Sequence, residues 1–248
     1  MILPVINTFQ EPYIVWHERE PTFEEQLEKI NSGNFHPLDT VKMGVKAEIL
    51  TPIDAAQYMA MEGTDNRLER LIDDVLHSSV ECKIWQNLMP SITPEPLIHY
   101  KQYYPKFDTD LVDNCIKQIG VLPAVGQHLF RGGFWPDGLT TVVTDQPLST
   151  SFCPQVALRN AEWKGKAYDE GKIDIFVIRV VEPRTNVYFY NLNETLGNEK
   201  EVLFASGATL RLISRKLIRD DFLVYKGISV CETVSKKVPI YVLEIEIS

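Results

Sequence analysis

The sequence has 248 residues, a formal net charge of -9 and a pI near 5.1. Hydrophobic residues make up 44% of the chain and charged residues 24%, a balance that is typical of globular proteins and excludes wholesale disorder. The acidic charge argues against a protein that binds nucleic acid non-specifically through its phosphates, although it leaves room for a local basic groove.

The cysteines and the N-terminus narrow the possible classes of protein further. The sequence has no C-x-x-C pair and no histidine at metal-ligand spacing beside its four scattered cysteines, Cys82, Cys115, Cys153 and Cys231. A disulfide framework or a structural zinc is therefore not expected. The N-terminus lacks a cationic leader, and no apolar run is long enough to span a bilayer. We expect a soluble protein that acts in the cytoplasm, with no metal and no membrane partner.

The first half of the chain has helical periodicity. Thr22 and Glu25 have the spacing of a capping box, apolar residues follow at helical intervals, and Gly33 is a stop signal. Comparable starts, apolar stripes and ends predict helices in residues 51–63, 65–79 and 108–120.

After Gly120 the apolar period changes to two. One helix is expected from Pro154 to about Trp163, among strands in residues 128–133, 140–143, 147–152, 174–181, 186–192, 201–204, 208–213, 222–227 and 240–247. A helical lobe followed by consecutive strands predicts an α+β fold with a mostly antiparallel core, built as one sheet or two. We expect a helical N-terminal region in residues 1–95 and a core in residues 96–248, which can also pack as one unit.

Two motifs in the β half contain residue types that could bind a ligand or take part in catalysis. In "QHLFRGG", Arg131 ends a strand beside Gly132 and Gly133, so its guanidinium and a closely approaching backbone could bind a phosphate. An exposed arginine before a turn is the simpler interpretation. In "LSTSF", Ser149 and Ser151 flank Thr150 and share one face of a strand, where a hydroxyl could meet a carboxylate across the sheet.

The third motif is a pair of glutamates. Glu199 and Glu201 in "NEKEVLF" follow a polar, glycine-containing loop and open an apolar strand. The same spacing recurs at Glu244 and Glu246, where alternation with apolar residues indicates an ordinary half-buried strand. Spacing alone therefore does not distinguish a catalytic pair from a solvated strand face.

In this order and after a helical lobe, the three motifs resemble those of the mono-ADP-ribosyltransferases of the Arg-Ser-Glu class, which includes bacterial toxins and phage enzymes. The resemblance covers roughly residues 95–248 and extends through "EKEVLFASGATLRLI". It implies a two-sheet ADP-ribosyltransferase core that uses NAD as co-substrate.

The resemblance also implies roles for the motif residues. Glu201 would hydrogen-bond the ribose next to nicotinamide, Ser149 would orient Glu201, and Arg131 would hold the diphosphate. Glu199 would orient or deprotonate the acceptor, which favours an arginine of a target protein. The remaining residues expected at the NAD site are Gly132, Thr150, Ser151 and Arg159, with Trp163 and Phe152 as aromatic candidates.

Three functions stay open on the sequence. The first is transfer of ADP-ribose to a protein arginine by an intracellular toxin, effector or phage enzyme, for which an antitoxin or immunity protein is a further expected partner. The second is the same NAD chemistry with nucleic acid or water as acceptor. The third is a non-catalytic binding module of the same fold.

Overall fold

The computed structural model describes residues 2–33, 39–229 and 232–248. The chain separates into two compact units, one formed by Met1–Thr8 and Thr51–Ser248 and the other by Phe9–Leu50. The predicted boundary between residues 95 and 96 stays a prediction.

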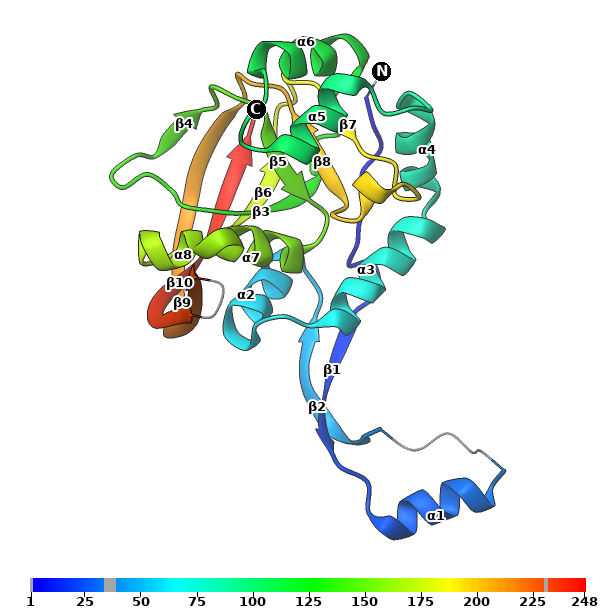
Figure 1. Ribbon diagram of the computed structural model, residues 1–248. Helices are drawn as coiled ribbons and strands as arrows, with labels where there is room; N and C mark the ends of the chain where they lie inside the picture. Colours follow the sequence, from blue (N-terminus) through cyan, green and yellow to red (C-terminus); the bar gives the residue numbers. More distant parts are fainter. Residues whose placement is uncertain (1, 34–38, 230–231) are drawn as a thin grey trace. The chain divides into compact units, whose positions relative to one another are not determined.

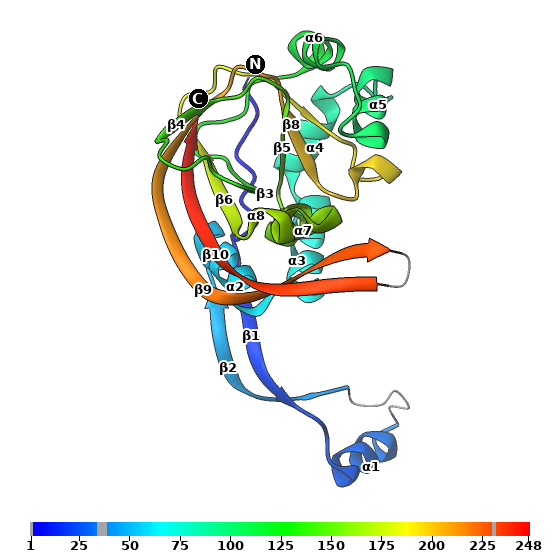
Figure 2. The same ribbon diagram turned by 60° about the vertical axis from the view of Figure 1, so that its left-hand side comes forward.

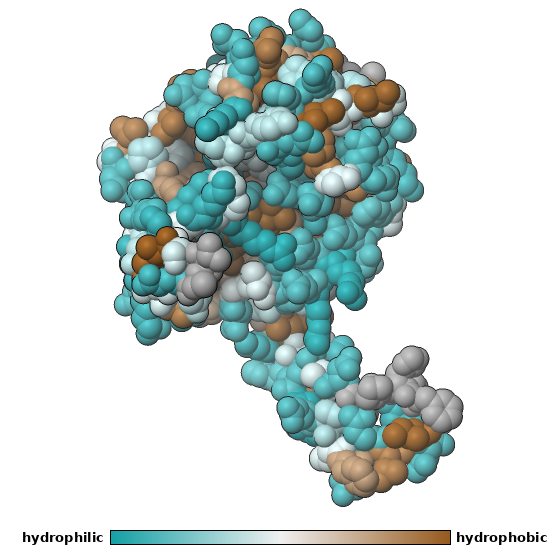
Figure 3. Space-filling model, viewed as in Figure 1, coloured by the Kyte–Doolittle hydropathy of each residue, from teal (hydrophilic) through white to brown (hydrophobic). Residues whose placement is uncertain are grey.

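The smaller unit contains a two-stranded antiparallel ribbon and one helix. Strands β1 (Tyr13–Arg19) and β2 (Val41–Ile49) pair with each other, and helix α1 (Phe23–Asn31) follows β1. The predicted capping box of Thr22 with Glu25 is confirmed. Helix α1 buries none of its residues and exposes the apolar side chains Phe23, Leu27 and Ile30 (Figure 3). The two strands were not predicted, because Gly44 and scattered polar residues interrupt their alternation.

The larger unit begins with helices. Helices α2 (Pro52–Glu62), α3 (Asn66–Ser78) and α6 (Thr109–Ile119) occur where the sequence predicts them, and α4 (Val80–Leu88) and α5 (Glu95–Tyr103) are additional. Their apolar faces are deeply buried, as at Met59, Leu68, Ile72 and Trp85. These helices therefore contribute directly to the hydrophobic core.

An eight-stranded sheet forms the rest of the core (Figure 1). The strands follow the order β4-β9-β10-β6-β3-β5-β8-β7, with β6 and β10 parallel and the other paired strands antiparallel. Their bounds are β3 (His128–Gly133), β4 (Thr141–Val143), β5 (Leu148–Ser151), β6 (Ile173–Val180), β7 (Val187–Phe189), β8 (Glu201–Phe204), β9 (Thr209–Ser229) and β10 (Glu232–Ile247). The α+β class and the mostly antiparallel core are confirmed.

The sheet has two sections that meet between β3 and β5. The register pair that joins these strands is Phe130 with Ser151, whereas β3 pairs with β6 over its whole length. The two predicted sheets are thus the sections β4-β9-β10-β6-β3 and β5-β8-β7. Figure 2 shows β9 and β10 as a long, bent ribbon, so the segments predicted at 208–213 and 222–227 belong to one strand.

Helices pack against the first section of the sheet. Helix α7 (Pro154–Glu162) packs on β3 and β6, and α2 packs on β6 and β10. A Cβ atom at Gly132 would lie 1.7 Å from the carbonyl oxygen of Ala157, so only glycine permits this approach of α7 to β3. After α7 come the 3-10 turn η1 (Trp163–Gly165) and helix α8 (Lys166–Glu170), while η2 (Thr195–Gly197) precedes β8.

Among the described residues, Cys82, Cys115 and Cys153 are free thiols, and Cys231 lies outside that set. In the same ranges, no helix has the length and apolarity needed to cross a membrane.

Candidate active site

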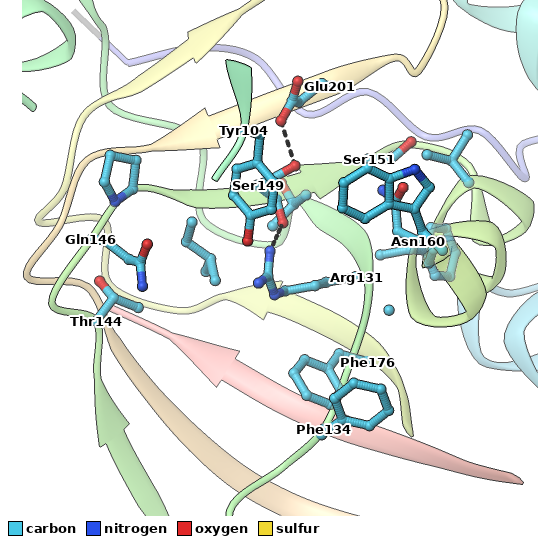
Figure 4. A pocket seen from close by; sticks show the side chains of 18 of the residues that line it. Tyr104, Arg131, Phe134, Thr144, Gln146, Ser149, Ser151, Asn160, Phe176 and Glu201 are labelled. Carbon is cyan, nitrogen blue, oxygen red and sulfur yellow. Dashed lines mark hydrogen bonds between the residues drawn. The ribbon is translucent and has the colours of Figure 1, made fainter. Parts of the chain in front are cut away.

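A cleft of about 770 Å³ opens where the two sections of the sheet meet (Figure 4). It is lined by the residues that the sequence predicts for the site, with the exceptions of Arg159 and Phe152. The residues brought together are Arg131, Gly132, Ser149, Thr150, Ser151, Glu199 and Glu201.

The Ser149 hydroxyl donates a hydrogen bond to Oε1 of Glu201 (Figure 4). Strands β5 and β8 are antiparallel with Ser151 opposite Glu201, so Ser149 lies on the same face, diagonal to the carboxylate. The Glu201 side chain is only 3% exposed. The sheet register therefore fixes the orientation of an almost completely buried carboxylate.

Glu199 has different surroundings. It lies in the turn before β8, and Lys200 has a left-handed backbone with φ of 51°, so the strand geometry does not yet extend to Glu199. The Glu199 side chain is 41% exposed, and its backbone carbonyl accepts a 2.7 Å hydrogen bond from the Ser151 hydroxyl. The two glutamates thus offer the cleft one buried and one accessible carboxylate.

A lysine of helix α5 contacts both glutamates. Nζ of Lys101, on α5, lies 2.5 Å from Oε2 of Glu201 and also forms an ion pair with Oε2 of Glu199. Burial lowers the pKa of Lys101, but the charges of Glu201 and Glu199 more than offset this, and the net shift is upward. Lys101 therefore carries a full positive charge at neutral pH.

Two tyrosines surround the buried carboxylate. Burial, followed by the negative charge of Glu201, raises the pKa of both Tyr100 and Tyr190. The Tyr190 hydroxyl donates to the carbonyl oxygen of Leu97 at 3.0 Å. Both phenols are consequently neutral, and the negative charge in this part of the site belongs to the carboxylates.

Lys200 anchors the turn between the glutamates. Its side chain is 4% exposed, and its Nζ lies 3.2 Å from Oε1 of Glu69 and 3.1 Å from Oδ1 of Asp73, both on α3. Gln155 of α7 also donates to Glu69, at 2.6 Å. Helix α3 thus holds the backbone that presents Glu199 and Glu201.

A second group of cationic side chains also lines the cleft. Nη1 of Arg131 donates a 2.6 Å hydrogen bond to the carbonyl oxygen of Ser149, which uses one of its five N–H donors (Figure 4). Lys164 and Lys166 also line the cleft, with their Nζ atoms 4.2 and 4.8 Å from the ring centroid of Trp163. Burial, and then the charges of Arg131 and Lys164, lower the pKa of Lys166. This clustering of like charge favours an anionic ligand.

Two predicted candidates lie elsewhere. Nη2 of Arg159 forms a 3.0 Å ion pair with Glu69, because α7 directs Arg159 toward α3 rather than into the cleft. Phe152 is buried in an aromatic cluster, 5.5 Å from the ring of Trp85. Gly132 lines the cleft, but its lack of a Cβ is required by the contact with α7.

Sequence reasoning missed the lysines of the site. Lys101 stands alone among aromatic residues in "HYKQYY", and its carboxylate partners are about a hundred positions away, so no local pattern connects them. Lys164 and Lys166 had a usable signal, because "WKGK" places two cations beside Trp163 directly after the predicted helix.

The described residues contain no group of three or more His, Cys, Asp or Glu side chains that could hold a metal ion. The site combines the Ser149 hydroxyl and the two carboxylates with a cationic wall formed by Arg131, Lys164 and Lys166. Such a cleft can bind an anionic ligand and stabilise a developing positive charge near the carboxylates.

The sequence matches no family model and no curated protein. Solved structures with a similar fold include the C2-I component of Clostridium botulinum C2 toxin, with 10% identity, a TM-score of 0.38, and coverage of 66% of this chain and 45% of that one. Another is the Vis toxin of Vibrio splendidus, with 16% identity, a TM-score of 0.39, and coverage of 77% and 90%.

The chain is similar to ADP-ribosyltransferase toxins. A third example is BECa of the Clostridium perfringens binary enterotoxin, solved with NADH, at 14% identity, a TM-score of 0.35, and coverage of 79% of this chain and 46% of that one. The chain thus spans less than half the length of C2-I and BECa. These values describe a distant likeness in fold, and the function rests on the side chains of this chain.

Proposed function

We propose that this protein is a mono-ADP-ribosyltransferase that transfers ADP-ribose from NAD to an arginine of a target protein and releases nicotinamide. The observation that supports it most is the convergence of Arg131, Ser149 and Glu201 in one cleft, linked by the hydrogen bonds from Arg131 to Ser149 and from Ser149 to Glu201. A cleft of about 770 Å³ is within the usual size for a cofactor-sized ligand.

The cationic wall suits the diphosphate of NAD. Arg131 offers the planar, always charged fork that pairs best with phosphate oxygens, and Lys164 and Lys166 add charge without fixed geometry. Trp163 and Tyr104, which also line the cleft, offer flat apolar surfaces for an aromatic ring of the substrate.

Glu201 suits the bond-breaking step. Nicotinamide leaves a cation as a neutral molecule, so its departure needs no strong acid, but the ribose carbon develops oxocarbenium character. A buried carboxylate held in place by Ser149 can stabilise that charge without reorganising. In this proposal Glu201 also orients the ribose through a hydroxyl group.

Glu199 suits the acceptor. Its carboxylate is the more exposed of the two, so a side chain entering from solvent can reach it. A guanidinium is always protonated in water, and attack on the ribose requires a neighbouring base or anion. The ion pair of Glu199 with Lys101 also favours a second candidate, hydrolysis of NAD by water, because this carboxylate already has a cationic partner.

Incubation with NAD labelled in the ADP-ribose half and a cell lysate tests the proposal, with Glu201→Gln as the inactive control. We expect labelled macromolecules that protease digestion removes and nuclease digestion does not. Label removed by nuclease alone would contradict a protein acceptor, and free ADP-ribose without labelled macromolecules would favour hydrolysis. No consumption of NAD by the purified protein would contradict both.

A further inference from the structure

Lys101 has a position that none of the predicted roles explains. It lies on α5, lines the cleft, is 12% exposed, and reaches both glutamates with a single ammonium group. Because each contacted oxygen is within hydrogen-bond distance of the same Nζ, the two oxygens are no more than about 5 Å apart.

Two carboxylates this close oppose each other's ionisation. Two negative charges at such a distance repel each other, and the burial of Glu201 leaves little water to screen that repulsion. A protonated Glu201 could not stabilise the oxocarbenium centre, so a charge must compensate for both burial and Glu199. Lys101 is the cation in direct contact with both carboxylates.

We propose that Lys101 is a positioning residue that holds Glu199 and Glu201 side by side and keeps Glu201 ionised at neutral pH. The inference rests on the proposed NAD chemistry. It also makes α5 a part of the active site, so that the helical region supplies a functional side chain as well as packing.

The charged and titratable groups around Glu201 come from several elements. Lys101 and Tyr100 come from α5, and the remaining groups are Tyr190 after β7, Glu199 before β8, and Arg131 on β3, whose charge acts on Tyr100. Both tyrosines have raised pKa values and stay neutral, and Arg131 donates its hydrogen bond to the carbonyl oxygen of Ser149 rather than to Glu201. Within this set, Lys101 provides the direct compensating charge.

The test is the pH dependence of nicotinamide release from NAD by the full-length protein and three variants. Lys101→Gln removes the charge but keeps an amide that can donate to the carboxylates, Lys101→Arg keeps the charge, and Lys117→Gln removes a charge on the neighbouring helix α6. Thermal melting of each variant verifies that it is folded. If Lys101→Gln does not fold, Lys101→Met provides a second variant with a neutral side chain.

We expect the acid limb of the profile to move upward by about 1 to 3 pH units in the neutral variants, the usual effect of losing an adjacent opposite charge. The limb should stay at the wild-type pH in Lys101→Arg and Lys117→Gln, even if the Lys101→Arg maximum is lower. A folded neutral variant whose limb is unshifted would overturn the role of Lys101 while leaving the NAD chemistry standing. Absence of nicotinamide release by the wild-type protein at every pH would instead contradict the proposed function, and with it this inference.

Discussion

Glu199 and Glu201 are one residue apart but have different environments. Glu201 begins β8, is buried, and accepts a hydrogen bond from Ser149, whereas Glu199 lies in the preceding turn and is exposed to solvent. The left-handed conformation of Lys200 separates the two environments, because it interrupts the extended backbone between them.

This asymmetry predicts a separation of activities. Glu199→Gln should lower transfer to arginine by about 10²-fold or more, the usual contribution of a positioned acid or base, while NAD hydrolysis remains appreciable. Rates of nicotinamide release and of label incorporation into an arginine-containing acceptor measure the two activities.

Glu244→Gln is the matched control, because Glu244 has the same spacing from Glu246 but lies on β10 and accepts a hydrogen bond from Ser214 outside the cleft. It should leave both rates unchanged. Equal loss of hydrolysis and transfer in Glu199→Gln would contradict the separate roles.

Among the individual residues of the cleft, the sequence predicted those that belong to a motif. Arg131, Ser149 and Glu201 were predicted because their order and neighbours form a recognisable pattern, and all three line the cleft. Arg159 was expected in the site, but its direction depends on how α7 is rotated, which its sequence does not determine. Lys101 was missed because only the folded chain brings α5 to the strand that starts at Glu201.

The principal connection between elements runs from α3 to the glutamate turn. Glu69 contacts Lys200, Arg159 and Gln155, which come from the turn and from α7. Burial raises the pKa of Glu69, but Lys200 and Arg159 overcome that effect and lower it below its usual value. The ion pairs therefore stabilise the folded state above the unfolded pKa of about 4.3 and are lost as the pH falls through the folded value.

Replacing this carboxylate should therefore have a pH-dependent cost. We expect Glu69→Gln to lower the free energy of unfolding at pH 7 by about 1 to 3 kcal/mol, the cost of a buried partner left unpaired. The difference from wild type should shrink as the pH falls below about 4, where Glu69 itself becomes protonated. Urea titrations at pH 7 and pH 3 measure this, and a difference that is constant with pH would contradict the ion-pair explanation.

Elements with strong end signals were predicted well and others were not. Helices α2, α3 and α6 have side-chain caps and regular apolar stripes, and each was found within a residue or two. Helix α5 begins at a proline without a side-chain cap and lies in a proline-rich stretch that suggests a loop. Strands β1 and β2 have few buried positions, so their burial imposes little alternation on the sequence.

The cleft belongs to one of the two units of the chain. Its lining residues all lie between Tyr100 and Leu210, within the unit of Met1–Thr8 and Thr51–Ser248. The described residues of the unit Phe9–Leu50 contribute none of them. Its chain ends are close together, because Tyr13 pairs with Ile49 in the ribbon.

Excision of the smaller unit should therefore preserve the chemistry. If residues 9–50 are replaced by a short glycine-serine link, we expect nicotinamide release at the wild-type rate and a melting temperature close to that of the full chain. Loss of NAD turnover in a folded excision variant would contradict the assignment of the whole cleft to the larger unit. Helix α1 of the excised unit exposes an apolar face that could contact a target protein. We therefore expect excision to affect labelling of the target more than nicotinamide release.

In the proposed function, Glu201, held by Ser149 in a cleft with a cationic wall, promotes cleavage of NAD. The rate of nicotinamide release by the purified wild-type protein and by Glu201→Gln tests it most directly. We predict measurable release by the wild type and a rate lower by about 10² to 10³-fold in the variant, with an unchanged melting temperature. Wild-type turnover that Glu201→Gln retains in full, or no turnover by the wild type, would contradict the claim.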